Sequence, residues 1–292
     1  MTSAGHAARD ISYAQSATTK GGRAVIRMME NATGRVGLIK RAQGYDADIA
    51  HGKSFWETIV DRYGLRLDVM AGSLMKIPRD GPLIVVANHP YGILDGLMLG
   101  HILAQRRGEF HIMAHRVFHG AQDINAHILP ISFDNTRRAL ELNLRTRKTA
   151  HACLQQGGAI GIFPGGTVST AATPFGQPLD PAWRKFTARL VMKSGATVVP
   201  IFFDGQTSRL FQIASHLHTT LRMGLLMKEF RKRVDTPVRV AIGAPVDPTA
   251  IQSFSHDAKG LMDFLRAQTY ALSPKPMPLT EYGFEFEEKY RA

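Results

Sequence analysis

Short runs of consecutive apolar residues alternate with longer amphipathic segments along most of this chain. The clearest runs are rich in β-branched or aromatic side chains, which is typical of buried strands in a parallel sheet, and they lie at 83–87, 159–163 and 197–203. Further strands are predicted at 65–69, 110–114 and 238–242, where polar or charged residues interrupt the apolar ones. Segments with helical spacing separate them, at 54–62, 94–107, 137–156, 181–194, 210–233 and 256–272. This order predicts an α/β fold with a mainly parallel or mixed sheet flanked by helices.

The ends of the chain differ in composition from its middle. Residues 1–22 are mostly small and polar, which predicts a poorly ordered tail. We expect a single domain at 23–272, with a helical N-terminal extension and a motif-bearing core at about 60–250. The prolines of 273–278 predict a break that separates this domain from a C-terminal extension at 273–292.

The strand at 83–87 ends in residues that carry chemistry. His89 comes just after the strand, and Asp95 lies near the start of the following helix. Catalytic groups of open α/β sheets tend to lie at the carboxyl ends of strands, and a His oriented by a carboxylate is the minimum equipment for general-base catalysis. The alternative is structural, with Asp95 as a helix N-cap and His89 as an ordinary surface residue.

Two further segments offer binding groups. The strand at 159–163 leads into Gly165, Gly166 and Thr167, where a Gly-rich turn would let backbone N–H groups approach a ligand; a tight turn with a capping Thr is the alternative. Arg137 and Arg138 begin a predicted helix. Each can bind a phosphate or carboxylate through two parallel hydrogen bonds, although two solvated charges would look the same in the sequence.

Four segments together resemble the glycerolipid acyltransferase family, which includes the lysophosphatidate acyltransferases. They are His89 to Asp95, Ile131 to Arg138, Phe163 to Thr167 and Val198 to Ile201, in the order and approximate spacing of the four family motifs. The likeness is strongest to the hemolysin-like and lysophospholipid acyltransferase branch. There the first motif often reads Asn-His-Pro-x-Gly-x-x-Asp-Gly, as residues 88–96 do here.

The resemblance implies an O-acyltransferase that moves a fatty acyl group to the hydroxyl of a lysolipid. The donor would be the thioester of acyl carrier protein or of coenzyme A, used as a co-substrate, and neither a metal nor a further cofactor is implied. His89 would be the general base and Asp95 the group that orients it. The implied substrate-binding residues are Arg137, Arg138, Gly165, Gly166 and Thr167.

The sequence departs from the family pattern at three places. Five residues, not four, separate His89 from Asp95, so the turn between them must absorb one more. Gly165 stands where the family has Glu, and Val168 where it has Arg. In the family those two residues help to bind a glycerol phosphate head group. The head group therefore stays open between a lysophospholipid and a lyso-aminolipid.

A net charge of +12 is the unusual bulk property of this chain. It suits an anionic membrane surface, an acidic carrier or nucleic acid, but no nucleic-acid-binding signature accompanies it. Residues 221–233 predict an amphipathic helix with a basic rim, which fits either a membrane interface or a core-facing helix. No apolar run of membrane-spanning length is present, and Cys153 is the single cysteine. We expect a peripheral protein on the cytoplasmic face of a membrane.

Other functions fit some of the same residues. A thioesterase or lipid hydrolase would use His89 to activate water, and a non-enzymatic lipid-binding protein would not need His89. His111, His115 and His119 have a spacing that would place them on one face of a helix, as in some metal sites. We expect a strand at 110–114 instead, and no metal site.

Overall fold

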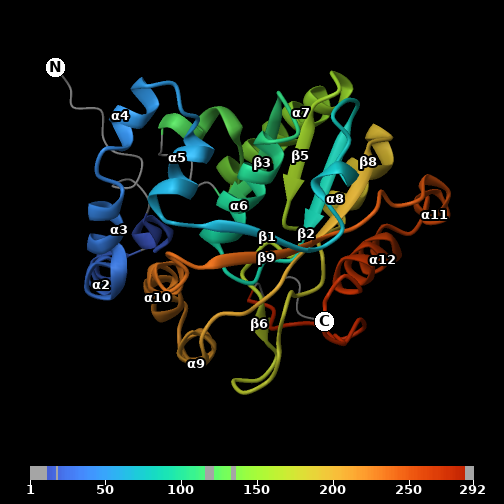
Figure 1. The fold of residues 1–292 in the computed structure, drawn as a ribbon. Coiled ribbons are helices and arrows are strands. Elements are labelled where there is room, and N and C mark those ends of the chain that lie inside the picture. Colours follow the sequence, from blue (N-terminus) through green and yellow to red (C-terminus); the bar gives the residue numbers. More distant parts are fainter. Residues whose placement is uncertain (1–11, 18, 116–121, 133–135, 287–292) are drawn as a thin grey trace.

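The computed structural model describes residues 12–17, 19–115, 122–132 and 136–286. Within these residues a seven-stranded sheet, with strand order β1-β9-β8-β2-β5-β3-β4, forms the centre of the fold (Figure 1). Its strands are β1 (Arg66–Ala71), β2 (Leu83–Ala87), β3 (Phe110–His115), β4 (Ile128–Ile131), β5 (Ala159–Ile162), β8 (Thr197–Phe203) and β9 (Pro237–Ile242). Within this sheet the paired strands are parallel except β8 and β9, which are antiparallel. The predicted fold class is confirmed.

Helices cover both faces of the sheet (Figure 1). They are α2 (Lys20–Glu30), α3 (Val36–Arg41), α4 (Tyr45–Ala50), α5 (Phe55–Arg62), α6 (Ile93–Ala104), α7 (Arg137–Gln155), α8 (Lys185–Ser194), α9 (Arg209–Leu217), α10 (Thr219–Arg231), α11 (Pro248–Gln252) and α12 (Ala258–Tyr270). The predicted helical N-terminal extension corresponds to α2, α3 and α4, with the π-helical turn Asn31–Arg35 between the first two. The remaining short elements are η1 (Tyr13–Ser16), η3 (Leu74–Lys76), η5 (Gln122–His127), β6 (Thr170–Ala171) and β7 (Pro178–Leu179).

The continuous apolar run of β2 is explained by this layering. All five residues of the strand are buried, because successive side chains point to opposite faces and each face is covered. Val85 belongs to the same core cluster as Leu94 of α6. Val86 packs in a second cluster with Leu154 of α7. The residues that follow β2, including His89, are therefore positioned by a strand that is buried on both faces.

Two elements differ from the predicted pattern. The edge strand β4 is not among the predicted strands. It contains Pro130, which lacks an N–H, and an edge position tolerates that loss. The helix expected at 181–194 begins only at Lys185. Before it, the Trp183 indole N–H donates to Asp180 Oδ2 over 2.9 Å, which holds residues 180–183 in a turn.

The prediction of a poorly ordered tail at 1–22 is wrong for the part of it that the structure describes. Tyr13 and Ala14 are buried, and Ser12 caps the η1 turn. The Ser12 hydroxyl and the Tyr13 backbone N–H donate to the two carboxylate oxygens of Glu30, over 2.6 and 2.7 Å. Glu30 is itself fully buried, and it anchors a segment whose small polar residues gave no sign of packing.

The helix expected at 210–233 is two helices, because His218 adopts an extended conformation between α9 and α10. The membrane-interface interpretation of its second half is also wrong. Leu225, Leu226 and Phe230 of α10 are buried in the main core, and Arg222 is 1% exposed. The apolar side of α10 is therefore used for packing inside the protein.

The C-terminal segment returns to the domain after the predicted break. Its backbone N–H groups at Gly283 and Phe284 donate to the carbonyls of Asp180 and Thr170, over 2.8 and 2.9 Å. The division at residue 273 stays a prediction. Among the described residues, no helix combines the length and the apolar character needed to cross a bilayer.

Candidate active site

His89 and Asp95 meet at the carboxyl end of β2. The His89 ring nitrogen Nδ1 lies 3.0 Å from Asp95 Oδ2. The same oxygen accepts the backbone N–H groups of Tyr91 and Gly92, over 2.7 and 3.0 Å. Gly92 has a φ of +83°, a conformation that glycine adopts without strain, and this turn absorbs the additional residue between His89 and Asp95. Asp95 therefore caps α6 and also contacts the imidazole.

The imidazole is held from several sides but keeps one nitrogen free. The His89 ring stacks on the Phe163 ring, with 4.3 Å between the centroids. The backbone N–H of His89 donates to Asp180 Oδ1 over 3.2 Å. The orientation of the imidazole ring leaves Nδ1 without a well-aligned hydrogen bond, although Asp95 Oδ2 is only 3.0 Å away. Catalytic hydrogen bonds often tighten only when substrate binds. No described residue hydrogen-bonds to Nε2, and the side chain is 18% exposed.

The Asp95 carboxyl is completely buried. Burial raises its pKa above the usual range, while the His89 ring and the N–H groups of Tyr91 and Gly92 act in the opposite direction. A buried carboxylate of this kind is stabilised by a cationic neighbour more than an exposed one would be, because little water competes. The arrangement can therefore orient a neutral imidazole and favour its protonation during a reaction.

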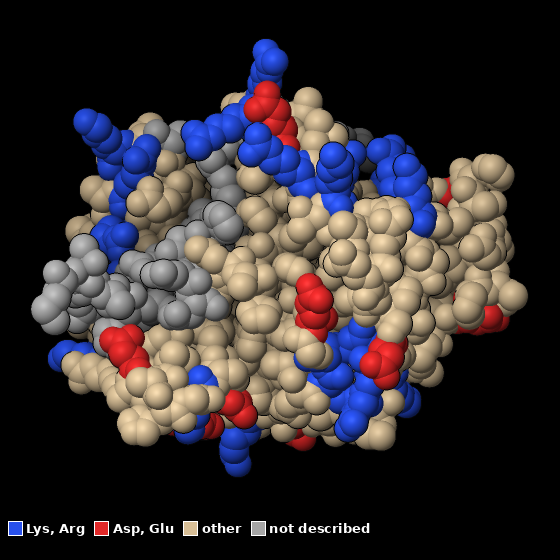
Figure 2. All heavy atoms as spheres, turned by 90° about the horizontal axis from the view of Figure 1, so that it is seen from above, with Lys and Arg blue, Asp and Glu red and all other residues tan. Residues whose placement is uncertain are grey.

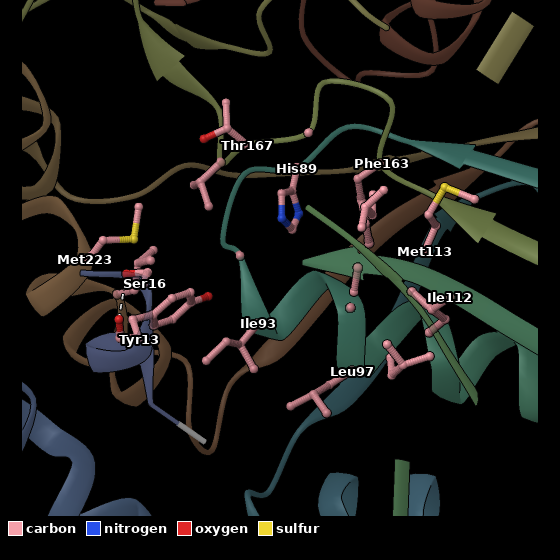
Figure 3. A pocket seen from close by; sticks show the side chains of 18 of the residues that line it. Tyr13, Ser16, His89, Ile93, Leu97, Ile112, Met113, Phe163, Thr167 and Met223 are labelled. Carbon is pink, nitrogen blue, oxygen red and sulfur yellow. Dashed lines mark hydrogen bonds between the residues drawn. The ribbon is translucent and has the colours of Figure 1, made fainter. Parts of the chain in front are cut away.

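A cavity of about 370 Å³ opens beside His89 (Figure 3). One side, which we call the sheet wall, comes from strand β3, from the segments that directly follow β2 and β5, and from α6: His89, Ile93, Leu97, Ile112 and Phe163. The opposite side, the outer wall, comes from the N-terminal segment, α10 and the C-terminal segment: Tyr13, Ser16, Arg222, Met223 and Phe286. Apart from His89, Ser16 and Arg222 the named residues are apolar or aromatic, so the cavity suits a hydrocarbon chain.

The Gly-rich turn lies at this cavity. Gly166 has a φ of +72° and its N–H donates to the Phe163 carbonyl over 3.0 Å, which makes the turn tight. Gly166 and Thr167 line the cavity. Gly165 does not line it and instead faces Asp180, since an added Cβ would lie 3.3 Å from the Asp180 Cβ. The proposed binding role of these three residues stays a prediction.

Arg137 and Arg138 lie elsewhere. Both are exposed at the start of α7. The Arg137 side chain is 93% exposed and pairs with Glu141, one turn along the same helix, over 3.2 Å. Neither residue lines the cavity, so the structure does not bring them together with His89.

Sequence reasoning missed the contribution of the outer wall. The sequence predicts Arg222 on the basic rim of an amphipathic helix that faces either a membrane interface or the core, yet Arg222 is buried beside the Gly-rich turn. Tyr13 was assigned to a disordered tail, and Phe286 had no assigned role. For Phe286 the signal was the aromatic character of residues 281–289, whereas the sequence around Tyr13 and Arg222 gave no sign of a cavity.

The structure describes only some of the histidines at which a metal site was not expected. His111 lies in β3, a strand, so the helical spacing does not apply; His119 lies outside the described residues. Within the described residues no group of three or more potential metal ligands is present.

Basic side chains dominate part of the molecular surface. Figure 2 shows Lys and Arg gathered along one edge of the face seen from above, with acidic residues fewer and dispersed. This distribution is consistent with the net charge of +12.

Comparisons with known proteins give a family match, a curated relative and a solved structure. Residues 71–204 match the profile of the family described as Acyltransferase. A lyso-glycine lipid O-acyltransferase from Phocaeicola vulgatus is 23% identical over 202 residues, covering 67% of this chain and 69% of that relative. The crystal structure of the 1-acyl-sn-glycerophosphate (LPA) acyltransferase PlsC from Thermotoga maritima aligns with a TM-score of 0.45 and 21% identity, over 75% of each chain.

Proposed function

We propose that this chain, which belongs to the glycerolipid acyltransferase family and is an acyltransferase of lipid metabolism, transfers a fatty acyl group from a thioester to the hydroxyl of a lysolipid. The observation that carries this proposal is the position of His89. Its ring lies 3.0 Å from a buried carboxylate and also lines a mainly apolar cavity. The name of the curated relative supports a lysolipid acceptor.

His89 acts as the general base in this proposal. Its Nε2 accepts the proton of the acceptor hydroxyl while the hydroxyl oxygen attacks the thioester carbonyl carbon. The tetrahedral intermediate collapses, the carbon–sulfur bond breaks, and the thiolate takes up the proton from the imidazolium. Asp95 keeps the neutral ring in the tautomer with hydrogen on Nδ1 and stabilises the imidazolium that forms.

The acyl chain occupies the cavity. Each methylene group removed from water contributes about 0.8 kcal/mol, so a long chain binds tightly to walls of this composition. Leu97 and Ile112 of the sheet wall and Met223 of the outer wall supply such contacts.

The donor is acyl carrier protein or coenzyme A in thioester form. Both are anionic, and the surface charge of this chain favours their approach as well as contact with an anionic membrane. The enzyme would then work as a peripheral protein on the cytoplasmic face of the membrane that contains its acceptor.

The test is acyl transfer by purified protein from radiolabelled acyl donors to a panel of lysolipids. His89→Ala and Asp95→Asn are measured beside it, with the exposed His256→Ala as the matched control. We expect transfer to an acceptor, lost in the first two variants and kept in the control. Release of free fatty acid without transfer would identify a hydrolase, and transfer retained in His89→Ala would remove His89 as the base.

A further inference from the structure

Arg222 is a buried charge in the outer wall of the cavity. It comes from α10 and is 1% exposed. Its Nη1 donates to the hydroxyls of Thr170 and Ser215, over 2.7 and 2.9 Å. Its Nη2 donates to the Thr167 hydroxyl over 3.0 Å and to the Val168 carbonyl over 2.8 Å. The guanidinium is thus fixed against the Gly-rich turn.

No carboxylate among the described residues forms an ion pair with this guanidinium. All four of its partners in those hydrogen bonds are neutral, and its other close neighbours are the rings of Phe211 and Phe286, at 4.9 and 4.1 Å from the guanidinium carbon. Burial lowers the pKa of Arg222 to about 9. An unpaired buried charge costs free energy, which an anion bound in the cavity would recover.

The other arginine of the cavity makes the contrast clear. Arg184 donates to both carboxylate oxygens of Glu285, over 2.7 and 2.9 Å, and the two charges cancel. Both residues line the cavity, as Arg222 does. Among the described lining residues Arg222 is therefore the one permanent cation without a counter-charge.

Two hydrogen-bond donors remain available at this position. The Nε–H of Arg222 makes no hydrogen bond to the described residues. The hydroxyls of Thr170 and Ser215 donate to backbone carbonyls, over 2.9 and 2.7 Å. The Thr167 hydroxyl accepts from Arg222 but has no described acceptor for its own hydrogen. One donor belongs to the guanidinium and the other contacts it, since Thr167 Oγ1 lies 3.0 Å from Nη2. Two donors beside one positive charge can serve the two oxygens of a carboxylate.

We propose that Arg222 and Thr167 form the recognition site for the head group of the acceptor, and that this head group carries a carboxylate with a single negative charge. This inference rests on the proposed function, because the ligand is the lysolipid that His89 deprotonates. The segment that carries Thr167 is hydrogen-bonded to the segment that carries His89. The backbone N–H of Ser169, two residues after Thr167, donates to the His89 carbonyl over 2.8 Å. A phosphate monoester, with up to two charges, has no second free cation in the described lining.

The experiment compares three lysolipids that share one acyl chain and one hydroxyl. Their head groups are a carboxylic acid, the corresponding primary amide and a phosphate monoester. We measure kcat/KM for each with the wild-type enzyme, Arg222→Gln, Thr167→Val and Thr167→Ser, and with Arg189→Gln, an exposed arginine, as the matched control. The ratio between acid and amide is independent of the fraction of enzyme that is folded.

We expect the wild type to prefer the acid over the amide by about 10- to 100-fold, the usual range for hydrogen bonds to a charged group. Arg222→Gln and Thr167→Val bring the ratio close to one, while Thr167→Ser and the control keep it. A ratio near one in the wild type, an unchanged ratio in Thr167→Val, or a preference for the phosphate monoester would overturn the proposal.

Binding separates this inference from the catalytic proposal. Calorimetric titration of His89→Ala with the acid and the amide, below their critical micelle concentrations, measures head-group selectivity without turnover. Selective binding of the acid that is lost in His89→Ala/Thr167→Val supports the carboxylate site even if no acyl transfer is found. Acyl transfer without selective binding of the acid would support the proposed acyltransferase activity and contradict the proposed carboxylate site.

Discussion

The sheet wall and the outer wall enclose the same cavity but come from different parts of the chain. The sheet wall is built from β3, from the residues that directly follow β2 and β5, and from α6, which follows β2, so the parallel sheet brings its members together. The outer wall joins Tyr13, Arg222 and Phe286, which are far apart in sequence and come from no common element. The first wall carries the proposed base, and the second the unneutralised charge.

The difference has a physical cause. Strands in register place their carboxyl ends along one edge, and β2 is paired with both β5 and β8. The outer wall has no such repeating geometry and depends on individual polar anchors, such as Glu30 and the pair of Arg184 with Glu285. We therefore expect the sheet wall to control the rate of reaction and the outer wall to control which acceptor binds.

The largest effect is expected from His89→Ala. Loss of a general base typically lowers the rate by about 10²- to 10⁴-fold. The fold should persist, because the side chain lies at the cavity and makes no described hydrogen bond through Nε2. Steady-state kinetics together with urea unfolding check both parts. A His89→Ala variant as active as the wild type would contradict the proposal that the general base lies in the sheet wall.

Asp95→Asn should lower activity to a similar or lesser extent without lowering stability. The raised folded-state pKa of Asp95 means that the native protein binds this proton more tightly than the unfolded chain does. Ionised Asp95 therefore reduces stability at pH above the raised pKa, and stability is regained as the pH falls through it. The variant removes that dependence while its amide oxygen can still accept the N–H groups of Tyr91 and Gly92.

The measurement is the free energy of unfolding of wild type and Asp95→Asn in urea, at neutral pH and at stepwise lower pH. We expect the variant to be at least as stable at neutral pH and to lose this advantage as the pH falls. A variant that is much less stable at neutral pH would show that the Asp95 charge holds the turn together.

A smaller effect is expected on the outer wall from Glu30→Ala. The change leaves the Ser12 hydroxyl and the Tyr13 N–H without their partners, at a cost of about 1–3 kcal/mol in unfolding free energy. It should also raise KM more than it lowers kcat, because it loosens Tyr13. Glu141→Ala, which removes an exposed carboxylate, is the matched control. Equal behaviour of the two variants would contradict the anchoring role of Glu30.

The smallest effect is expected from Arg137→Ala. Its side chain is exposed and outside the cavity, so stability should change by no more than about 0.5 kcal/mol. Kinetics with acceptors of different head groups test its predicted binding role directly. A loss of kcat/KM that depends on the head group would move acceptor recognition from the outer wall to the start of α7.

Several features could be predicted from the sequence because they depend on local patterns. The apolar run at 83–87 predicted β2, and the alternation of strands and helices predicted the mixed sheet. The same apolar runs placed His89 and the turn at 165–167 each just after a strand, and only the structure showed that these two strands are neighbours. The contact between His89 and Asp95 needed the structure, since it depends on the positive φ of Gly92.

The tertiary structure alone decided the outer wall. Whether Arg222 faces water or the cavity depends on which side of α10 packs against the core, and a helix with apolar and basic residues fits both. The burial of Tyr13 depends on Glu30, seventeen residues away, whose carboxylate finds its donors only in the folded chain. Periodicity records what a residue does within its own element, whereas long-range hydrogen bonds between segments leave no periodic signal.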